Sequence, residues 1–218
     1  MQPIEPKVNA SRLVFLLSPA SCTGRRAGYL LRPQATFDLA SRLQRGPAPG
    51  LGEVFAFMSG LYFRGKLAYA SAYGRGGEGV EPVRIITPTR GLLSPSTPAD
   101  AALIAEFAGI DVRLEEPRYR VPMAASVAAL VDALSINDRV VLLGSIATGK
   151  YVDLLLPPLG DRLLFPPAFV GRGDMSRGGL LLRCVDDRTE LEYAPLSGAI
   201  RKGARPPRLE PRPPRSGR

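Results

Sequence analysis

Three short stretches of almost wholly apolar residues constrain the fold of this chain more than any other feature. They cover residues 12–17, 83–87 and 139–143, and longer segments with helical spacing separate them. A run of four to eight apolar residues bounded by turn residues is typical of a strand buried on both faces. The sequence therefore predicts an α/β fold, with a mostly parallel sheet and helices on both of its faces.

The segments between these runs carry helix, strand and turn signals. The expected helices cover residues 26–45 with a break at Pro33, 60–73, 97–108 and 124–134. Thr97 to Asp100 is typical of a helix start, with Pro98 at the first helical position. Residues 115–122 (EEPRYRVP) indicate a loop, and residues 54–58 a short strand. Residues 180–185 and 190–194 are expected to form a C-terminal β-hairpin.

The C-terminal residues differ in composition from the rest of the chain. Residues 201–218 contain five Pro, seven Lys or Arg and one acid, with almost no apolar side chain. Such a segment cannot bury enough surface to offset the entropy lost on ordering. We therefore expect a single α/β domain over residues 1–200, followed by a disordered basic tail over residues 201–218. The tail carries six of the nine net positive charges, so the expected domain is only mildly basic.

The sequence indicates a cytoplasmic protein with no membrane partner. No apolar run approaches the roughly 20 residues that a membrane-spanning helix needs. The N-terminal segment MQPIEPKVNASR is polar and lacks the pattern of a signal peptide. Only two cysteines are present, which also favours the cytoplasm.

The absence of histidine restricts the chemistry of this chain. It excludes a Ser-His-Asp or Cys-His nucleophile pair, a His-ligated zinc or haem, and an imidazole base. The two cysteines exclude a four-cysteine zinc site or iron–sulfur cluster. We expect no metal and no cofactor. Any acid–base work must therefore fall to carboxylates, Lys or Tyr.

Three loops that follow buried runs are rich in Ser, Thr, Gly and cations. They are residues 18–26, 87–95 and 144–151. In an open parallel sheet, ligands sit beyond the carboxyl ends of the strands, where such loops gather. Backbone amides and hydroxyls suit a phosphate, a nucleotide or another anion. The alternative is that these are ordinary strand-to-helix turns, which need small residues in any case.

The third loop, GSIATGKY, matches most of a phosphate-binding loop. Gly144, Gly149 and Lys150 have the required spacing, but Tyr151 stands where a Ser or Thr should bind Mg²⁺. A working ATPase or GTPase is therefore not expected, although Lys150 could still contact a phosphate.

Cys22 lies close to Arg25 and Arg26, which could lower the pKa of its thiol and make it nucleophilic. The alternative is a small loop residue without a reactive role. Cys184 lies in an apolar run that was expected to be a core strand.

The segment 169–183 (FVGRGDMSRGGLLLR) combines glycines with Arg172, Asp174 and Arg177. Such a segment could fold around an anion, with Asp174 as a base. The alternative is a tight loop held by a pair of Asp174 with an arginine. The candidate catalytic residues are Asp174, Asp153 and Cys22. The candidate anion- or nucleotide-binding residues are Arg25, Arg90, Gly144, Ser145, Thr148, Lys150, Tyr151, Arg172 and Arg177.

Two stretches resemble a known family. Residues 57–70 contain an S-x-L-Y start and a helix that ends in Tyr-Ala, and residues 85–93 (IITPTRGLL) run from a strand into a Gly-Leu turn. This layout resembles the bacterial peroxide-stress protein family and related domains found beside deazaguanine transglycosylases. The resemblance implies a similar fold and a role in DNA or nucleobase handling, but no particular activity. The chain departs from the family at residues 87–90 (TPTR) and at SPASCTGRR.

Two functional hypotheses follow. The first is a nucleic-acid- or nucleotide-binding protein, accessory to DNA modification or repair. DNA or RNA would bind the tail through Arg201, Lys202, Arg205 and Arg208. The alternative is an enzyme that acts on a nucleobase, nucleoside or nucleotide through carboxylate, Lys and Arg side chains. For the tail, a solubilising end without a partner also remains open.

Overall fold

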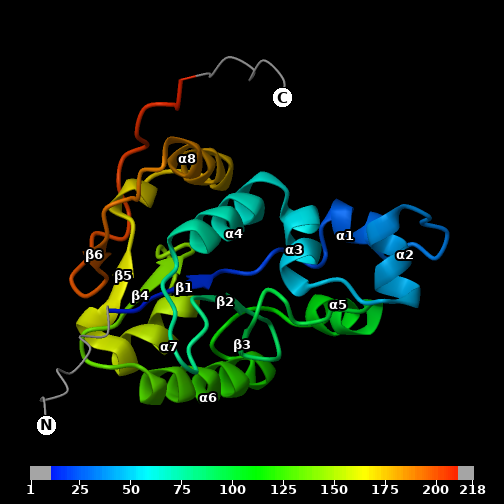
Figure 1. The fold of residues 1–218 in the computed structure, drawn as a ribbon, viewed down its shortest axis with the longest axis horizontal. Helices are drawn as coiled ribbons and strands as arrows, with labels where there is room; N and C mark the ends of the chain where they lie inside the picture. Colours follow the sequence, from blue (N-terminus) through cyan, green and yellow to red (C-terminus); the bar gives the residue numbers. More distant parts are fainter. Residues whose placement is uncertain (1–10, 211–218) are drawn as a thin grey trace, which may run out of the picture.

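The computed structural model describes residues 11–210, which form a mixed six-stranded sheet enclosed by helices (Figure 1). The strand order is β3-β2-β1-β4-β5-β6. The four central strands are parallel: β2 (Val83–Ile86), β1 (Leu13–Leu17), β4 (Arg139–Leu143) and β5 (Leu163–Phe165). The edge strands β3 (Leu92–Leu93) and β6 (Ala194–Pro195) run antiparallel. The predicted α/β class is confirmed, and the parallel arrangement holds for the central strands only.

Helices cover both faces of the sheet, as predicted. All five residues of β1 are buried; Leu13, Phe15 and Leu17 pack on one face, and Val14 and Leu16 on the other. The first face packs against α1 (Arg25–Leu30), α2 (Asp38–Arg45), α3 (Leu51–Ser59), α4 (Leu61–Tyr73), α5 (Ala101–Ala108) and α8 (Asp174–Asp187). The second face packs against α6 (Pro117–Ala133) and α7 (Gly149–Leu159). Figure 1 shows α4 and α8 on one side of the sheet and α6 and α7 on the other.

The strand predicted at residues 54–58 is wrong, because this segment belongs to helix α3. Its buried side chains are Leu51, Val54, Phe55 and Met58, which is the spacing of one helix face. Residues 54–58 alone are too short to show the helical spacing of their buried side chains, so the segment resembles a strand. The buried face begins three residues earlier, at Leu51.

The C-terminal hairpin is also wrong in its first arm. Residues 180–185 lie within helix α8, where Gly178, Leu181 and Cys184 are buried. Gly178 and Gly179, both poor helix formers, directly precede the apolar run at residues 180–182, and this combination hid the helical repeat. In the second arm, only Ala194 joins a strand, and its partner is Phe165 of β5. Cys184 is buried, as expected, but in a helix.

Two helices begin at residues other than those predicted. Helix α5 begins at Ala101, where Asp100 caps it by accepting a hydrogen bond from the Leu103 amide at 2.8 Å. Helix α6 includes most of the predicted loop at residues 115–122, because Glu116 is its N-cap and Pro117 takes the first turn. Tyr119 and Met123 are fully buried, and this burial retains the helix despite Pro122 within it.

Residues 201–210 of the predicted tail form no helix or strand. The Pro207 carbonyl accepts a hydrogen bond from Arg172 Nη1 at 3.3 Å, and the Glu210 carbonyl accepts one from Arg183. This part of the tail therefore lies against the α8 region. Residues 211–218 lie outside the described residues. Between residues 11 and 210, no helix combines the length and apolar character required to cross a membrane.

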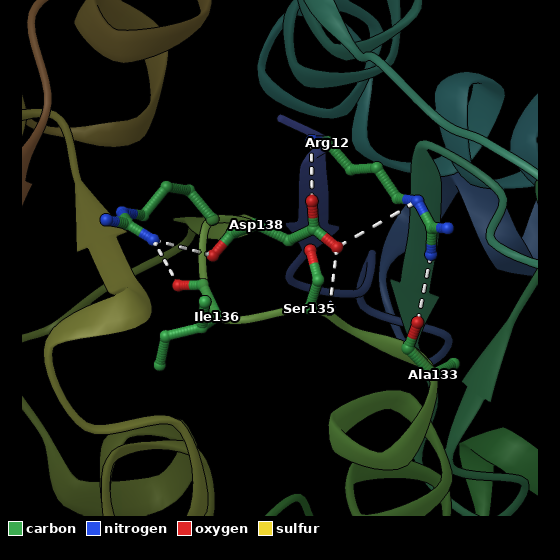
Figure 2. Close-up of polar contacts among 6 residues, drawn as sticks. Arg12, Ala133, Ser135, Ile136 and Asp138 are labelled. Atoms are coloured by element: carbon green, nitrogen blue, oxygen red, sulfur yellow. Dashed lines mark hydrogen bonds and ion pairs between the residues drawn. The ribbon is translucent and has the colours of Figure 1, made fainter. Parts of the chain in front are cut away.

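At the amino ends of β1 and β4, the buried carboxylate of Asp138 joins the two strands (Figure 2). It accepts hydrogen bonds from the backbone amides of Arg12 and Ser135, each at 2.8 Å. The Arg12 guanidinium lies 3.9 Å away and also donates to the Ala133 carbonyl. Burial opposes ionisation of Asp138, but these hydrogen bonds and the Arg12 charge outweigh it and lower the pKa. This contact fixes the register between β1 and β4. The same register places the carboxyl ends of both strands side by side at the opposite edge of the sheet.

Helices α4 and α8 approach each other through two glycines. A Cβ atom on Gly65 would lie 2.7 Å from the Gly178 carbonyl oxygen, and one on Gly178 would lie 2.7 Å from the Leu61 carbonyl oxygen. Only hydrogen fits at either position. This close approach sets the positions of the α4 and α8 side chains at the carboxyl edge of the sheet.

We predict that Gly178→Ala lowers the free energy of unfolding by about 1–3 kcal/mol, because the new methyl group forces the helices apart. The matched control is Gly179→Ala on the same helix, where the nearest atom would lie 3.5 Å away. Its expected effect is neutral or stabilising, by up to about 1 kcal/mol, because Ala is the better helix former. Urea unfolding of both variants tests this. Equal losses in the two variants would contradict it.

Candidate functional site

A cavity of about 440 Å³ opens at the carboxyl ends of β1 and β4. The next strand in the chain after β1, β2, lies on one side of β1, and β4 lies on the other side. The cavity therefore lies at the point where the strand order reverses. Open α/β sheets bind ligands at such points. Hydroxyl groups in its wall come from Ser18, Ser21, Thr23, Ser59 and Ser145; charged groups come from Asp111, Lys150 and Asp174. Apolar wall residues include Met58, Phe107, Ile110 and Val112.

Beneath this wall lies the buried amine of Lys66, which is 1% exposed. Its Nζ atom is 2.7 Å from the Ser18 hydroxyl oxygen and 2.5 Å from the Ser18 carbonyl oxygen. The same atom lies 4.4 Å from the centre of the Tyr62 ring and 5.0 Å from that of Phe63. Burial lowers the pKa of Lys66 from 10.5 to about 7. Burial thus favours the uncharged form of this amine.

Tyr62 lines the cavity, and its ring packs against the Lys66 amine. The buried hydroxyl of Tyr62 makes no hydrogen bond of normal geometry within the described residues. Burial raises its pKa to about 12, and the nearby positive charge of Arg177 partly opposes this rise. A protonated phenol at this position can donate to a ligand.

Asp174 and Arg177 reach this region from the first turn of α8. Asp174 lines the cavity and its side chain is 70% exposed. Arg177 lies 3.6 Å from the Asp174 carboxylate and donates two hydrogen bonds to the Phe169 carbonyl. Its guanidinium is therefore held by the protein and contributes its charge rather than a free contact.

The glycine-lysine loop lies between β4 and α7, in the strand-loop-helix setting of a phosphate loop. Lys150 and Tyr151 both line the cavity, together with Ser145. The Asp153 carboxylate, however, lies beside the first turn of α7, where a Cβ atom on Gly149 would stand. Its negative charge there disfavours an anion at the helix N-terminus. The first turn of α7 is consequently a poor phosphate site, and Lys150 is the cation that remains available.

Gly144 has a packing role that the sequence did not indicate. A Cβ atom at this position would lie 3.1 Å from Cβ and 3.4 Å from Oγ of Ser18. The glycine thus allows the ends of β1 and β4 to meet closely. The Ser18 amide donates to the Leu143 carbonyl at 3.2 Å.

Cys22 lines the cavity, but its environment does not favour a thiolate. Burial raises the pKa of its thiol to about 12. The nearby Arg26 donates instead to the Phe57 carbonyl at 3.2 Å, and the Arg25 guanidinium lies 5.9 Å from the Tyr29 ring centre. The expectation that these arginines activate Cys22 is therefore wrong.

The remaining candidates do not meet at the cavity. Arg90 makes two hydrogen bonds, at 2.8 and 2.6 Å, to Glu106, whose pKa they lower to about 2. Arg172 is bound to the Ala168 and Pro207 carbonyls. Thr148 is the exposed N-cap of α7, without a side-chain capping bond. Arg201, Lys202, Arg205 and Arg208 are exposed on the tail.

Ser18, Tyr62 and Lys66 were not among the predicted site residues. A signal was present for Lys66, which shares a helix face with Tyr62, Tyr69 and Ala70, all of them buried. A lysine in such a row indicates a buried amine with specific partners. The partner itself, Ser18, is 48 residues away and could not be paired with it from sequence.

Comparisons with protein-family models, with curated proteins and with solved structures gave no match for this chain. Across residues 11–210, no three Cys, Asp or Glu side chains gather in an arrangement that could hold a metal ion.

We predict that the lowered pKa of Lys66 makes stability depend on pH. Between pH 7 and 10.5 the unfolded chain binds a proton at Lys66 that the folded chain does not bind, so stability rises with pH. In Lys66→Met this contribution is lost. Between pH 7 and 9, the wild type should therefore gain stability relative to the variant by up to about 1.4 kcal/mol per pH unit.

Urea unfolding across this range measures the effect, and Lys202→Met, which removes an exposed lysine, is the control. A difference between Lys66→Met and the wild type that stays constant with pH would show that Lys66 is charged in the fold.

Proposed function

We propose that this chain binds a nucleotide in the cavity at the carboxyl ends of β1 and β4. The observation that carries the proposal is the position of the cavity at the strand-order reversal, with Lys150 in its wall. Its other groups suit the parts of a nucleotide. The hydroxyls of Ser18, Ser21 and Ser145 match a sugar, and Met58 and Phe107 offer apolar surface to a base.

The phosphate would contact Lys150, since the Asp153 carboxylate lies beside the first turn of α7. The Tyr62 hydroxyl is buried and has no hydrogen-bond partner in the part of the chain that the structure describes, so it is a donor that a polar ligand would satisfy. These features favour a ligand with one anionic end and one flat apolar end. Nucleobase or nucleoside handling, as the family resemblance implies, is compatible with such a ligand.

Calorimetric titration with a panel of nucleoside 5′-monophosphates tests this proposal. We expect binding that weakens about tenfold or more in Lys150→Ala, because a charged hydrogen bond is lost. Arg90→Ala is the matched control: it removes one positive charge outside the cavity, where Arg90 pairs with Glu106. Absence of binding at millimolar concentrations, or equal weakening in both variants, would reject the proposal.

A second candidate function, nucleic-acid binding, is favoured by the tail. Arg201, Lys202, Arg205 and Arg208 lie within eight residues, and all four are exposed. Closely spaced exposed cations bind phosphate backbones without sequence preference and with steep dependence on salt.

We predict that replacing these four cations with Gln reduces oligonucleotide affinity and lowers the slope of log K against log salt by about 3–4. Fluorescence anisotropy with single- and double-stranded DNA and with RNA, between 50 and 200 mM salt, measures both. A matched variant, in which four exposed cations of the folded domain become Gln (Arg45, Arg64, Arg113 and Arg120), controls for net charge. Equal slopes in the two variants would assign the binding to bulk charge and reject a role for the tail.

The alternative function is an enzyme that acts on a nucleobase, nucleoside or nucleotide. The lining of the cavity reduces the number of carboxylates that could serve such an enzyme. Of the predicted catalytic carboxylates, Asp174 lines it and Asp153 does not. An enzyme would use Asp174 together with Lys150, and the same mononucleotide panel followed for product formation tests this alternative.

A further inference from the structure

The strongest chemical feature of the molecule is the contact between the Ser18 hydroxyl and the Lys66 amine. The two atoms are 2.7 Å apart, and Lys66 is fully buried. Within residues 11–210, no carboxylate forms an ion pair with this amine. Its neighbours are the Ser18 carbonyl oxygen, the Ser18 hydroxyl and the faces of the Tyr62 and Phe63 rings.

These neighbours match the valences of an uncharged amine. The charged amine donates to both Ser18 oxygens. In the uncharged amine, one N–H still donates to the Ser18 carbonyl, a second can face the Tyr62 ring, and the lone pair can accept the proton of the Ser18 hydroxyl. A buried ammonium without a counterion would be costly. The lowered pKa of Lys66, about 7, agrees with this assignment. Lys66 is therefore able to accept the proton of Ser18.

Ser18 is also placed where a reacting group is needed. It immediately follows β1, at the carboxyl edge of the sheet, and lines the 440 Å³ cavity. Gly144 packs closely beside this serine and has no Cβ atom to crowd it, since a Cβ there would lie 3.1 Å from Ser18 Cβ. The base lies behind the serine and the cavity in front of it, which is the arrangement of an activated nucleophile.

We propose that Ser18 is a nucleophile, activated by Lys66, that cleaves a small ester or amide with an anionic group within reach of Lys150. In the first step, Ser18 Oγ attacks the carbonyl carbon and its proton passes to Lys66 Nζ. The bond to the alcohol or amine then breaks, and the leaving group takes the proton from Lys66. Water then attacks the acyl carbon and gives a proton to Lys66 Nζ. The bond from that carbon to Ser18 Oγ breaks, Oγ takes the proton back from Lys66, and the carboxylic acid is released. Serine-lysine pairs perform this chemistry on unrelated folds.

The inference shares its cavity with the proposed nucleotide site, but it does not require that the ligand be a nucleotide. Its test uses an alkyl fluorophosphonate, which a nucleophilic serine attacks at phosphorus with loss of fluoride. We expect one adduct per chain, located on Ser18 by peptide mass spectrometry. The rate of labelling should rise with pH through a midpoint near 7, as Lys66 loses its proton.

Ser18→Ala should abolish labelling, and Lys66→Met should slow it by a factor on the order of 100 or more. Lys66→Arg, which keeps a donor but cannot act as a base, should be as slow as Lys66→Met. Ser71→Ala, which changes an exposed serine on the same helix as Lys66, is the control and should label as the wild type does. Circular dichroism and thermal unfolding confirm that each variant is folded.

Wild-type protein that is folded yet unlabelled at Ser18 across pH 6–9 overturns the proposal, whatever the behaviour of the Lys66 variants. A labelling rate without a pH midpoint near 7, or equal rates in folded Lys66→Met, overturns the role of Lys66. Labelling in a protein that binds no mononucleotide supports Ser18 and rejects the nucleotide site. Protection of Ser18 by a mononucleotide supports both.

Discussion

The close approach of α4 and α8 is the contact on which the arrangement at the carboxyl edge depends. Gly65 and Gly178 bring the two backbones within reach of each other, and any side chain at either position would separate them. Tyr62 and Lys66 project from α4, and Asp174 and Arg177 from α8. The distance between the helices therefore decides whether these four side chains act in one electrostatic environment. The charges of Asp174 and Arg177 both influence the pKa of Tyr62 and of Lys66, although burial is the larger cause of each shift.

A buried ionisable group lies at each end of β1. The two groups differ in how the protein compensates for the cost of burying a charge. At the amino end, the Asp138 carboxylate is satisfied by two backbone amides and lies near Arg12, so its charge is stabilised and its pKa falls. At the carboxyl end, the Lys66 amine has no such counterion among residues 11–210, and its pKa falls because of burial. The first arrangement fixes a register. The second leaves a basic lone pair beside a serine.

The abundant arginines serve mostly the fold and not the cavity. Arg42 pairs with Asp38 and Glu53, Arg90 with Glu106, and Arg118 with Glu116. Others donate to backbone carbonyls. The cationic group left at the cavity is Lys150, and a separate set of exposed cations lies on the tail. The net charge of the chain accordingly says little about the site. Which cations a ligand can reach depends on where each side chain lies and on whether it is already paired with a carboxylate or carbonyl group.

The sequence by itself determined three of the four central strands and their burial, but it did not indicate β5. Short, continuous apolar runs at residues 12–17, 83–87 and 139–143 have few alternatives once both faces must be covered. It also gave candidate residues in the loops that follow them, since parallel strands share a carboxyl edge. Ser145 and Lys150 were predicted in this way, whereas Asp174 was predicted from the composition of residues 169–183, and all three line the cavity. The helices α3 and α8 were missed in part because glycine and runs of apolar residues obscured their repeat.

Only the tertiary structure decided which polar groups meet. Ser18 and Lys66 lie 48 residues apart, and their contact exists because α4 packs across the end of β1. Gly144 and Gly178 resembled ligand-binding glycines in the sequence, yet in the structure they allow close packing. Cys22 resembled a nucleophile beside arginines, but burial raises the pKa of its thiol. A sequence pattern fixes spacing along the chain, whereas burial and distance between segments set the protonation state of each group, and these arise only when the chain has folded.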